Sequence, residues 1–288
     1  VTSIALVNSR GFAGSYRGTV VSRGCSPVAE DGENKRTASY GSMSRGYAGI
    51  ESVEAIARMA ARRAVDMIGA TKPETMRVPV IFERDVAASI LSDIFAAVSG
   101  ANVAVANSFL ADRLGSRVGS DLVTIVDDGR LPGGIGTSPF DAEGVPTRRT
   151  TVFDRGELRS FLFDTYYARK LGAATTANAA GGGIGPNNFY LLPGTASLES
   201  LIAATPRGVL VLDTIGFATE HVSGTYSRGA RGFLIEGGAL TRPIDGFTVA
   251  GNFVEMLAGV DMVADDLRFD STIIAPSFRV AEMTVSGS

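Results

Sequence analysis

Residues 221–257, HVSGTYSRGARGFLIEGGALTRPIDGFTVAGNFVEML, combine a polar glycine-rich turn, two short strands and the start of a helix. The polar side chains come first, and the apolar run of Phe233, Leu234 and Ile235 then opens a strand. A glycine-rich polar loop beside a buried strand lets a ligand approach the backbone closely. The stretch therefore contains a candidate binding loop.

The candidate binding residues of this loop carry hydroxyl groups, cations and the single histidine of the chain. They are His221, Ser223, Thr225, Tyr226, Ser227, Arg228 and Arg231. The alternative is an ordinary β-hairpin, in which Gly224 and Gly229 only supply the positive φ angles of a turn. Only the first interpretation assigns a ligand to the loop.

Composition and charge describe an ordinary globular protein. The chain has 288 residues, of which 45% are hydrophobic and 20% are charged, and its formal net charge is -3. Its 27 Lys and Arg residues balance 30 Asp and Glu residues and form no basic run, so a DNA-binding surface is not expected. Cys25 is the single cysteine, which excludes a disulfide within the chain.

The features that would direct the chain to a membrane or out of the cell are not visible. No apolar run is long enough for a membrane-spanning helix, and the start VTSIALVNSRG lacks the order of a signal peptide. Low cysteine content fits a reducing compartment. We therefore expect a cytoplasmic protein, and the first residue, Val1, leads us to expect that the chain is part of a longer one.

The spacing of hydrophobic residues predicts a few amphipathic helices among many short strands. Residues 50–68 and 85–98 repeat apolar side chains at helical spacing, while most other segments alternate between glycines and polar turns. The predicted fold class is α+β, a mostly antiparallel sheet in a sandwich or barrel-like arrangement with a few helices. Residues 1–77 are predicted to end an N-terminal α/β region that includes helix 50–68, and residues 78–288 to form a β-rich C-terminal domain.

Two pairs of adjacent carboxylates are candidates for general acid–base catalysis. They are Asp127 with Asp128 and Asp265 with Asp266. Because adjacent side chains in a strand or turn usually point apart, solvated turns are favoured over a catalytic pair. The loop at residues 138–144 carries two further carboxylates and is interpreted either as a functional loop or as a solvated one.

A single histidine limits the catalytic chemistry of the chain. Zinc sites need three or four N, S or O ligands, and His221 with the distant Cys25 cannot make the common pair on one helix. His221 could join Ser223 or Ser227 and an Asp in a triad, although no G-x-S-x-G turn is present. An autonomous hydrolase that uses His221 and a nearby serine stays open as an alternative.

Short segments along the whole chain resemble the sequence motifs of one family. In and near the quoted stretch they are GTYSRGA at 224–230, GFLIEGG at 232–238, Pro243 and TVAGN at 248–252. Elsewhere they are PVIF at 79–82, SPFDAEGV at 138–145, YARKLG at 167–172 and MTVSG at 283–287. The chain thus resembles the TldD/PmbA family of peptidase-like proteins, also called modulators of DNA gyrase, and a family N-terminal domain is expected ahead of Val1.

The resemblance implies a choice between two branches. TldD-like members carry H-E-x-x-x-H on the helix after the strand at 79–82 and a cysteine near the C-terminus, which bind zinc. PmbA-like members, also called TldE, lack these ligands and pair with the TldD-like subunit. Here residues 85–98 contain no histidine and residues 265–277 contain no cysteine. The chain therefore resembles the PmbA/TldE branch, the zinc-free subunit of a heteromeric metallopeptidase for peptide maturation or degradation.

The resemblance also implies the partners. Neither a catalytic residue nor a metal or other cofactor is expected in this chain, and zinc is expected in the TldD-like partner. We expect an extended peptide substrate, no direct contact with nucleic acid or membrane, and a homodimer as a possible state in isolation. Residues 223–231 are expected to line a peptide or partner groove. Regulation of DNA gyrase is a third interpretation, although the acidic balance provides no DNA-facing patch.

Overall fold

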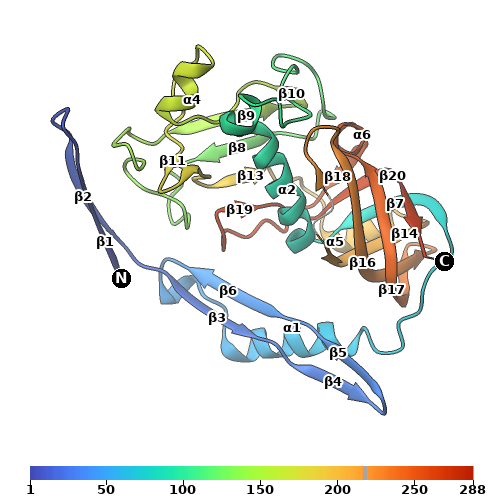
Figure 1. The fold of residues 1–288 in the computed structure, drawn as a ribbon. Helices are drawn as coiled ribbons and strands as arrows, with labels where there is room; N and C mark the ends of the chain where they lie inside the picture. Colours follow the sequence, from blue (N-terminus) through green and yellow to red (C-terminus); the bar gives the residue numbers. More distant parts are fainter. Residues whose placement is uncertain (217–218, 288) are drawn as a thin grey trace.

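The computed structural model describes residues 1–216 and 219–287. Strands dominate, and they divide into a slender N-terminal module and a larger body (Figure 1). No helix in the two described ranges is long and apolar enough to cross a membrane. The predicted α+β class with mostly antiparallel strands is confirmed.

The N-terminal module consists of hairpins and one long helix. Its elements are β1 (Thr2–Val7), β2 (Ala13–Gly18), β3 (Val21–Cys25), β4 (Val28–Asp31), β5 (Asn34–Thr37), β6 (Tyr40–Ser44), η1 (Tyr47–Gly49) and α1 (Val53–Val65). The pairs β3–β6 and β4–β5 form one curved ribbon, and α1 packs along it (Figure 1). Tyr40, Ile56 and Ala60 form a small core between the ribbon and the helix. The helix predicted at residues 50–68 is thus present in a shorter form.

Five strands of the body close into a barrel. They are β7 (Met76–Phe82), β14 (Arg207–Ile215), β16 (Thr225–Glu236), β17 (Ala239–Asn252) and β20 (Phe278–Ser286). The strand order is β14-β7-β20-β17-β16, and β16 pairs again with β14, which closes the ring. Within the ring β7 and β14 run parallel, and the other neighbouring strands run antiparallel. The predicted barrel-like arrangement is confirmed.

Two shorter strands extend this sheet, and a second sheet lies beside it. The extensions are β15 (Thr219–Glu220) next to β16 and β18 (Val260–Val263) next to β20. The second sheet has the order β10-β9-β8-β13-β19. Its strands are β8 (Ile125–Asp128), β9 (Arg149–Asp154), β10 (Glu157–Leu158), β13 (Phe189–Leu191) and β19 (Ile273–Ile274).

Helix α2 (Arg84–Val98) packs between the barrel and the second sheet (Figure 1). Helical spacing places Ile90, Leu91 and Ile94 in the buried interior, where they join the main hydrophobic core with residues of both sheets. The helix predicted at residues 85–98 is confirmed. This helix therefore connects the two layers of the body.

Short helices and one small hairpin complete the body. They are α3 (Gly100–Val103), α4 (Thr165–Lys170), α5 (Leu198–Ala203), α6 (Phe253–Ala258), β11 (Ala179–Ala180) and β12 (Gly183–Ile184). Side chains cap three of these helices, since Asp164 accepts from the Tyr167 N–H at 2.7 Å, Ser197 from the Ser200 N–H at 3.2 Å and Asn252 from the Val254 N–H at 3.0 Å. These caps explain where α4, α5 and α6 begin.

The stretch at residues 221–257 forms a long hairpin of the barrel rather than two short strands. β16 has 12 residues and β17 has 14, because both strands pair on both sides in the closed ring. The turn lies at Gly237 and Gly238, whose φ angles are 59° and 77°. A turn at Gly224 and Gly229 is wrong as an account of this hairpin. Gly224 does have a φ of 73°, but Gly229 lies within β16.

Candidate functional site

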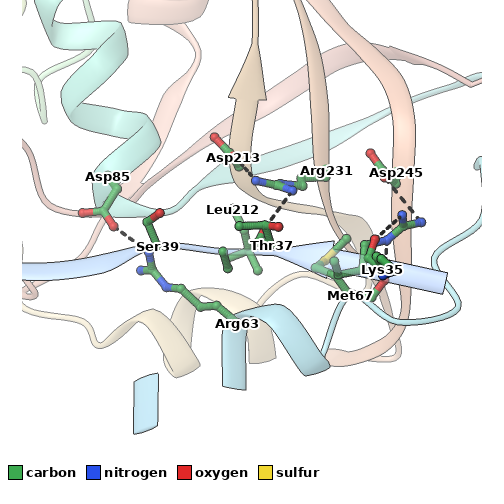
Figure 2. Close-up of a pocket in the computed structure, with 12 residues that line it drawn as sticks. Lys35, Thr37, Ser39, Arg63, Met67, Asp85, Leu212, Asp213, Arg231 and Asp245 are labelled. Carbon is green, nitrogen blue, oxygen red and sulfur yellow. Dashed lines mark hydrogen bonds and ion pairs between the residues drawn. The ribbon is translucent and has the colours of Figure 1, made fainter. Parts of the chain in front are cut away.

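A pocket of about 630 Å³ lies between the N-terminal module and the barrel (Figure 2). Its walls come from β5, from α1, from the N-terminus of α2 and from the barrel strands β14, β16 and β17. The lining residues are Lys35, Arg36, Thr37, Ala38, Ser39, Arg63, Met67, Asp85, Leu212, Asp213, Arg231 and Asp245. We refer to it as the β5 pocket, and it contains Arg231 of the predicted binding residues.

One edge of β5 faces this pocket. The other edge pairs with β4, and the consecutive residues 35–39 all line the pocket. Because successive side chains point to opposite faces of a strand, a pocket that touches all of them lies along the strand edge. The guanidinium of Arg231 donates to the backbone oxygen of Thr37 at 3.3 Å. An open edge of this kind offers backbone groups with which an added strand can pair.

The arginines of the β5 pocket face carboxylates. The ion pairs are Arg36 with Asp245 at 3.7 Å, Arg63 with Glu83 and with Asp85, both at 2.8 Å, and Arg231 with Asp213. Burial raises the pKa of the Glu83 carboxyl, the nearby Asp85 charge raises it further, and the Arg63 charge opposes both effects. The positive charges of these arginines are therefore compensated within the wall.

Tyr40 holds the module against the body beside the pocket. Its ring lies within 5.0 Å of the guanidinium carbons of Arg63 and Arg268 and 6.0 Å from that of Arg84. Its hydroxyl accepts from Arg84 at 3.0 Å and donates to Glu51 at 3.0 Å. Cation–π contacts and charge-assisted hydrogen bonds together position the ribbon that carries β5.

Tyr226 and Arg228 of the predicted set point toward α2 and the core instead of the β5 pocket. Tyr226 is fully buried, and burial raises the pKa of its phenol. The guanidinium of Arg228 donates to Ser89 at 2.7 Å and to Asp93 at 2.6 Å, both on α2. The neighbouring rings of Tyr226 are Phe82 and Phe253, with centroids 6.3 and 5.6 Å away. Arg228 therefore joins the barrel to α2, and Tyr226 packs in the core against β7 and α6.

His221, Ser223 and Thr225 lie in and next to the turn that precedes β16. The Ser223 hydroxyl donates to Glu220 at 3.1 Å and lies 2.8 Å from the Thr225 hydroxyl. The Nδ1 atom of His221 is buried, and no hydrogen-bond partner for it exists within residues 1–216 and 219–287. Ser227 is half-buried on β16. The described residues show no hydrogen bond between His221 and a serine, so they do not assemble the triad of the alternative hypothesis.

Two family models match the chain. Residues 75–287 match the PmbA/TldA metallopeptidase C-terminal domain, and residues 1–68 match the PmbA/TldA metallopeptidase central domain. The chain belongs to this family. It is the TldD/PmbA family that the sequence resembles.

Relatives in this family include sequences and solved structures. A metalloprotease PmbA homolog of Haemophilus influenzae is 34% identical over 282 residues, which cover 98% of this chain and 62% of that protein. A candidate modulator of a DNA gyrase from Thermotoga maritima has a TM-score of 0.91 and 30% identity, over 99% of this chain and 66% of that one. TldE from Thermococcus kodakarensis has a TM-score of 0.91 and 26% identity, over 99% of this chain and 67% of that one. The chain spans about three fifths of the length of the curated relatives it matches.

The metallopeptidase family name implies a metal, and the resemblance points to α2 for the ligands. Here α2 contains no histidine, its Asp93 pairs with Arg228, and its Ile90 and Ile94 are buried in the core. Across the part of the chain that the structure describes, no group of three His, Cys, Asp or Glu side chains could hold a metal ion. The residues present on α2 do not fit a zinc ion.

Asp127 is buried, so the solvated turn predicted for it is wrong. Its carboxylate accepts from the Asn178 side chain at 2.7 Å and from the backbone and side chain of Asn187, both at 2.8 Å. Burial raises the pKa of Asp127 to about 6, although these hydrogen bonds act in the opposite direction. The contacts join β8 to the small-residue tract 173–188. The sequence could not show this, because the partners lie 51 and 60 positions away.

The carboxylates of the loop at residues 138–144 bind backbone groups. Asp141 accepts from the N–H groups of Glu143 and Val145, both at 2.9 Å. Glu143 accepts from the backbone and the hydroxyl of Thr165 at 2.9 and 2.8 Å. These contacts shape the loop, and neither side chain lines the β5 pocket.

Most residues of the β5 pocket were not predicted as site residues. In the sequence, residues 35–39 are a short and mostly polar segment without a recognisable motif. Asp213 and Asp245 are single acids with no acidic neighbour. The pocket exists only because the module packs against the barrel, a contact between distant segments. The polar composition of residues 34–37 indicates an exposed strand but does not indicate which part of the chain it faces.

Proposed function

We propose that the chain is the zinc-free, PmbA/TldE-type subunit of a heteromeric TldD-type metallopeptidase and that it binds an extended peptide along β5. The observation that carries this proposal is the open edge of β5 along a pocket of about 630 Å³. A strand edge binds an extended peptide through backbone hydrogen bonds. The TldD-type partner would supply the zinc and the hydrolytic step, in peptide maturation or degradation.

The charges of the β5 pocket support binding of peptides with varied sequences. Because Arg63 and Arg231 face carboxylates, the wall carries little uncompensated charge that would select one peptide side chain. Backbone pairing is independent of side-chain identity. A subunit that presents peptides of many sequences to a peptidase fits both features.

Metal content and activity test the zinc-free assignment. The purified full-length protein should contain less than about 0.1 equivalent of zinc and hydrolyse no peptide alone. Addition of the TldD-type subunit from the same cell should produce peptidase activity in a stable complex. Stoichiometric, tightly bound zinc in the chain alone would overturn the assignment.

A histidine variant separates the proposal from the autonomous hydrolase. If the isolated chain hydrolyses peptides and His221→Ala abolishes the activity, the hydrolase interpretation replaces ours. If the isolated chain is inactive, His221 has no catalytic role of its own. Size-exclusion chromatography of the same sample shows whether the chain forms a homodimer without its partner.

Isolation from native cells distinguishes a peptidase subunit from a regulator of DNA gyrase, which the names of some structural relatives suggest. Recovery of a protein that bears H-E-x-x-x-H supports the peptidase complex. Recovery of gyrase without such a protein supports the regulatory function instead. The net charge of -3 favours the first outcome, because it provides no general attraction to DNA.

A further inference from the structure

A second pocket, of about 600 Å³, is lined by residues of β9 and of the loop after α4. Both elements lie far from β5 in Figure 1. Its walls come from the loop after α3, from β9, from the residues after β10 and from the loop after α4. None of the predicted binding residues lines it. We refer to it as the β9 pocket.

Apolar side chains form a large part of the β9 pocket wall. Phe161 and Phe163 lie in its wall and are each 6% exposed, while Leu114 and Leu171 also line it and are 56% and 40% exposed. Two large aliphatic side chains exposed next to a cavity are a feature of binding sites for apolar groups. Burial of an apolar chain here would remove both leucines from water.

The charged residues that line this pocket are all cations. They are Arg148, Arg149 and Arg159. Arg149 lies 3.8 Å from Asp128, and Arg159 lies 2.8 Å from Glu157. Arg148 donates to the backbone oxygen of Thr175, and no carboxylate within residues 1–216 and 219–287 forms an ion pair with it. The pocket therefore carries a positive charge that the described residues do not compensate.

A hydroxyl group of the pocket wall also lacks a partner. The Oγ1 atom of Thr150 is buried, and no hydrogen bond to it is made by the residues that the structure describes. Thr150 lies next to Arg149 on β9 and lines the same pocket. Because this oxygen atom is itself buried, the donors of the pocket that a ligand can reach are the exposed guanidinium groups of Arg148 and Arg149.

We propose that the β9 pocket binds an organic carboxylate that bears an apolar chain. The apolar chain lies between Phe161, Phe163 and the two leucines, and the carboxylate accepts from the guanidinium of Arg148. A medium-chain fatty acid and the apolar C-terminal residue of a peptide share this chemistry. The inference does not depend on the function proposed for β5, since the two pockets share no lining residue.

Calorimetric titration of the full-length protein tests the proposal with two carboxylate probes. These are decanoate and acetyl-Ala-Leu with a free carboxyl group, and their neutral controls are decanol and acetyl-Ala-Leu amide. At least one carboxylate should bind saturably with one site per chain, about tenfold tighter than its neutral control. Binding of decanoate alone identifies a fatty acid as the source, and binding of the peptide alone identifies a peptide C-terminus. If neither binds below about 1 mM, or if the neutral controls bind equally well, the proposal is wrong.

Two variants locate the binding in this pocket. Arg148→Gln should weaken binding of the carboxylate about tenfold, whereas Arg169→Gln, an exposed arginine of α4 outside the lining, should leave it unchanged. Ala174→Trp places a large ring at an exposed position of the pocket wall and should weaken binding through the apolar chain. Thermal unfolding of each variant confirms that it folds. Unchanged affinity in folded Arg148→Gln would overturn the proposal.

Discussion

The β5 pocket and the β9 pocket have nearly the same volume, about 630 and 600 Å³. They differ in whether carboxylates compensate the charges of their arginines. In the β5 pocket Arg63 and Arg231 face carboxylates of the same wall. In the β9 pocket Arg148 faces a backbone oxygen. The comparison shows that cavity size does not decide the ligand. In the β5 pocket the arginine charges are compensated, so the strand edge recognises the ligand. In the β9 pocket the charge of Arg148 is not compensated, so the pocket selects an anion.

The largest effect is expected from removal of a compensating charge in the β5 pocket. Arg63→Ala leaves the Glu83 carboxylate, whose side chain is 8% exposed, without its closest cation. Loss of one partner of a buried ion pair should lower the free energy of unfolding by about 3 kcal/mol. Urea denaturation at neutral pH measures this loss.

An exposed pair on the same helix provides the matched control. Arg62 pairs with Asp66 at 3.3 Å, but the Arg62 side chain is 75% exposed. Arg62→Ala should therefore cost less than about 0.5 kcal/mol. The double change Arg63→Ala with Glu83→Gln should recover part of the loss, because the buried side chain at position 83 is then neutral. Equal costs for Arg62→Ala and Arg63→Ala would contradict the compensation of charge in this pocket.

Asp127 provides a third case, a buried carboxylate with amide partners and no cation. Asp127→Asn turns one acceptor oxygen into a donor that faces the amides of Asn178 and Asn187. The variant should lose about 2 kcal/mol of unfolding free energy at pH 7. Urea denaturation of both proteins at the same pH gives the difference.

The pH dependence of this difference follows from the raised pKa. The native state holds the proton of Asp127 up to about pH 6, above the ordinary value of 3.8. The stability contributed by this group is therefore complete below the ordinary pKa and decreases as pH rises through about 6. The wild type should exceed Asp127→Asn by more at pH 4 than at pH 7. A gap that stays constant or narrows at pH 4 would show that the pKa of Asp127 is not raised in the native state.

Backbone recognition at β5 predicts an intermediate effect on peptide affinity. A peptide in which one amide that pairs with β5 is N-methylated should bind about tenfold more weakly than its parent, because it loses a hydrogen bond and gains a steric clash. Replacement of a peptide Lys by Glu should change the affinity less than about twofold. Fluorescence anisotropy measures both, and a larger effect of the charge change would favour side-chain recognition.

The smallest expected effect concerns salt. Raising the ionic strength from about 0.05 to 0.5 M should weaken carboxylate binding at the β9 pocket about threefold, since Arg148 is partly exposed to solvent. Peptide binding at β5 should stay nearly constant across the same range. Calorimetry at several salt concentrations separates the two sites, and equal salt dependence would remove the distinction between them.

Local patterns predicted the elements of this fold better than their arrangement. Helical spacing predicted α2, because this signal lies within a few residues. The lengths of β16 and β17 were not predicted. They depend on pairing with β14 and β20, which no local pattern reports.

The candidate site shows the same limit. Arg231 was predicted to bind, and it lines the β5 pocket, but the sequence grouped it with Tyr226 and Arg228, which contact the core and α2. Tyr226 and Arg228 are two positions apart on β16 and therefore share one face of the strand. The contacts of Arg228 with α2 became visible only in the structure. The residues of β5 were missed because the barrel strands on the other side of the pocket follow them by more than a hundred residues.

The closed ring also constrains how the chain is made. β20 pairs with β7 on one side and with β17 on the other, so the last strand in the sequence completes the barrel. A ribosome that synthesises the chain from its N-terminus releases β7 long before β20 is available. Until residues 278–286 emerge, β7 and β17 expose unpaired edges that can bind other nascent chains.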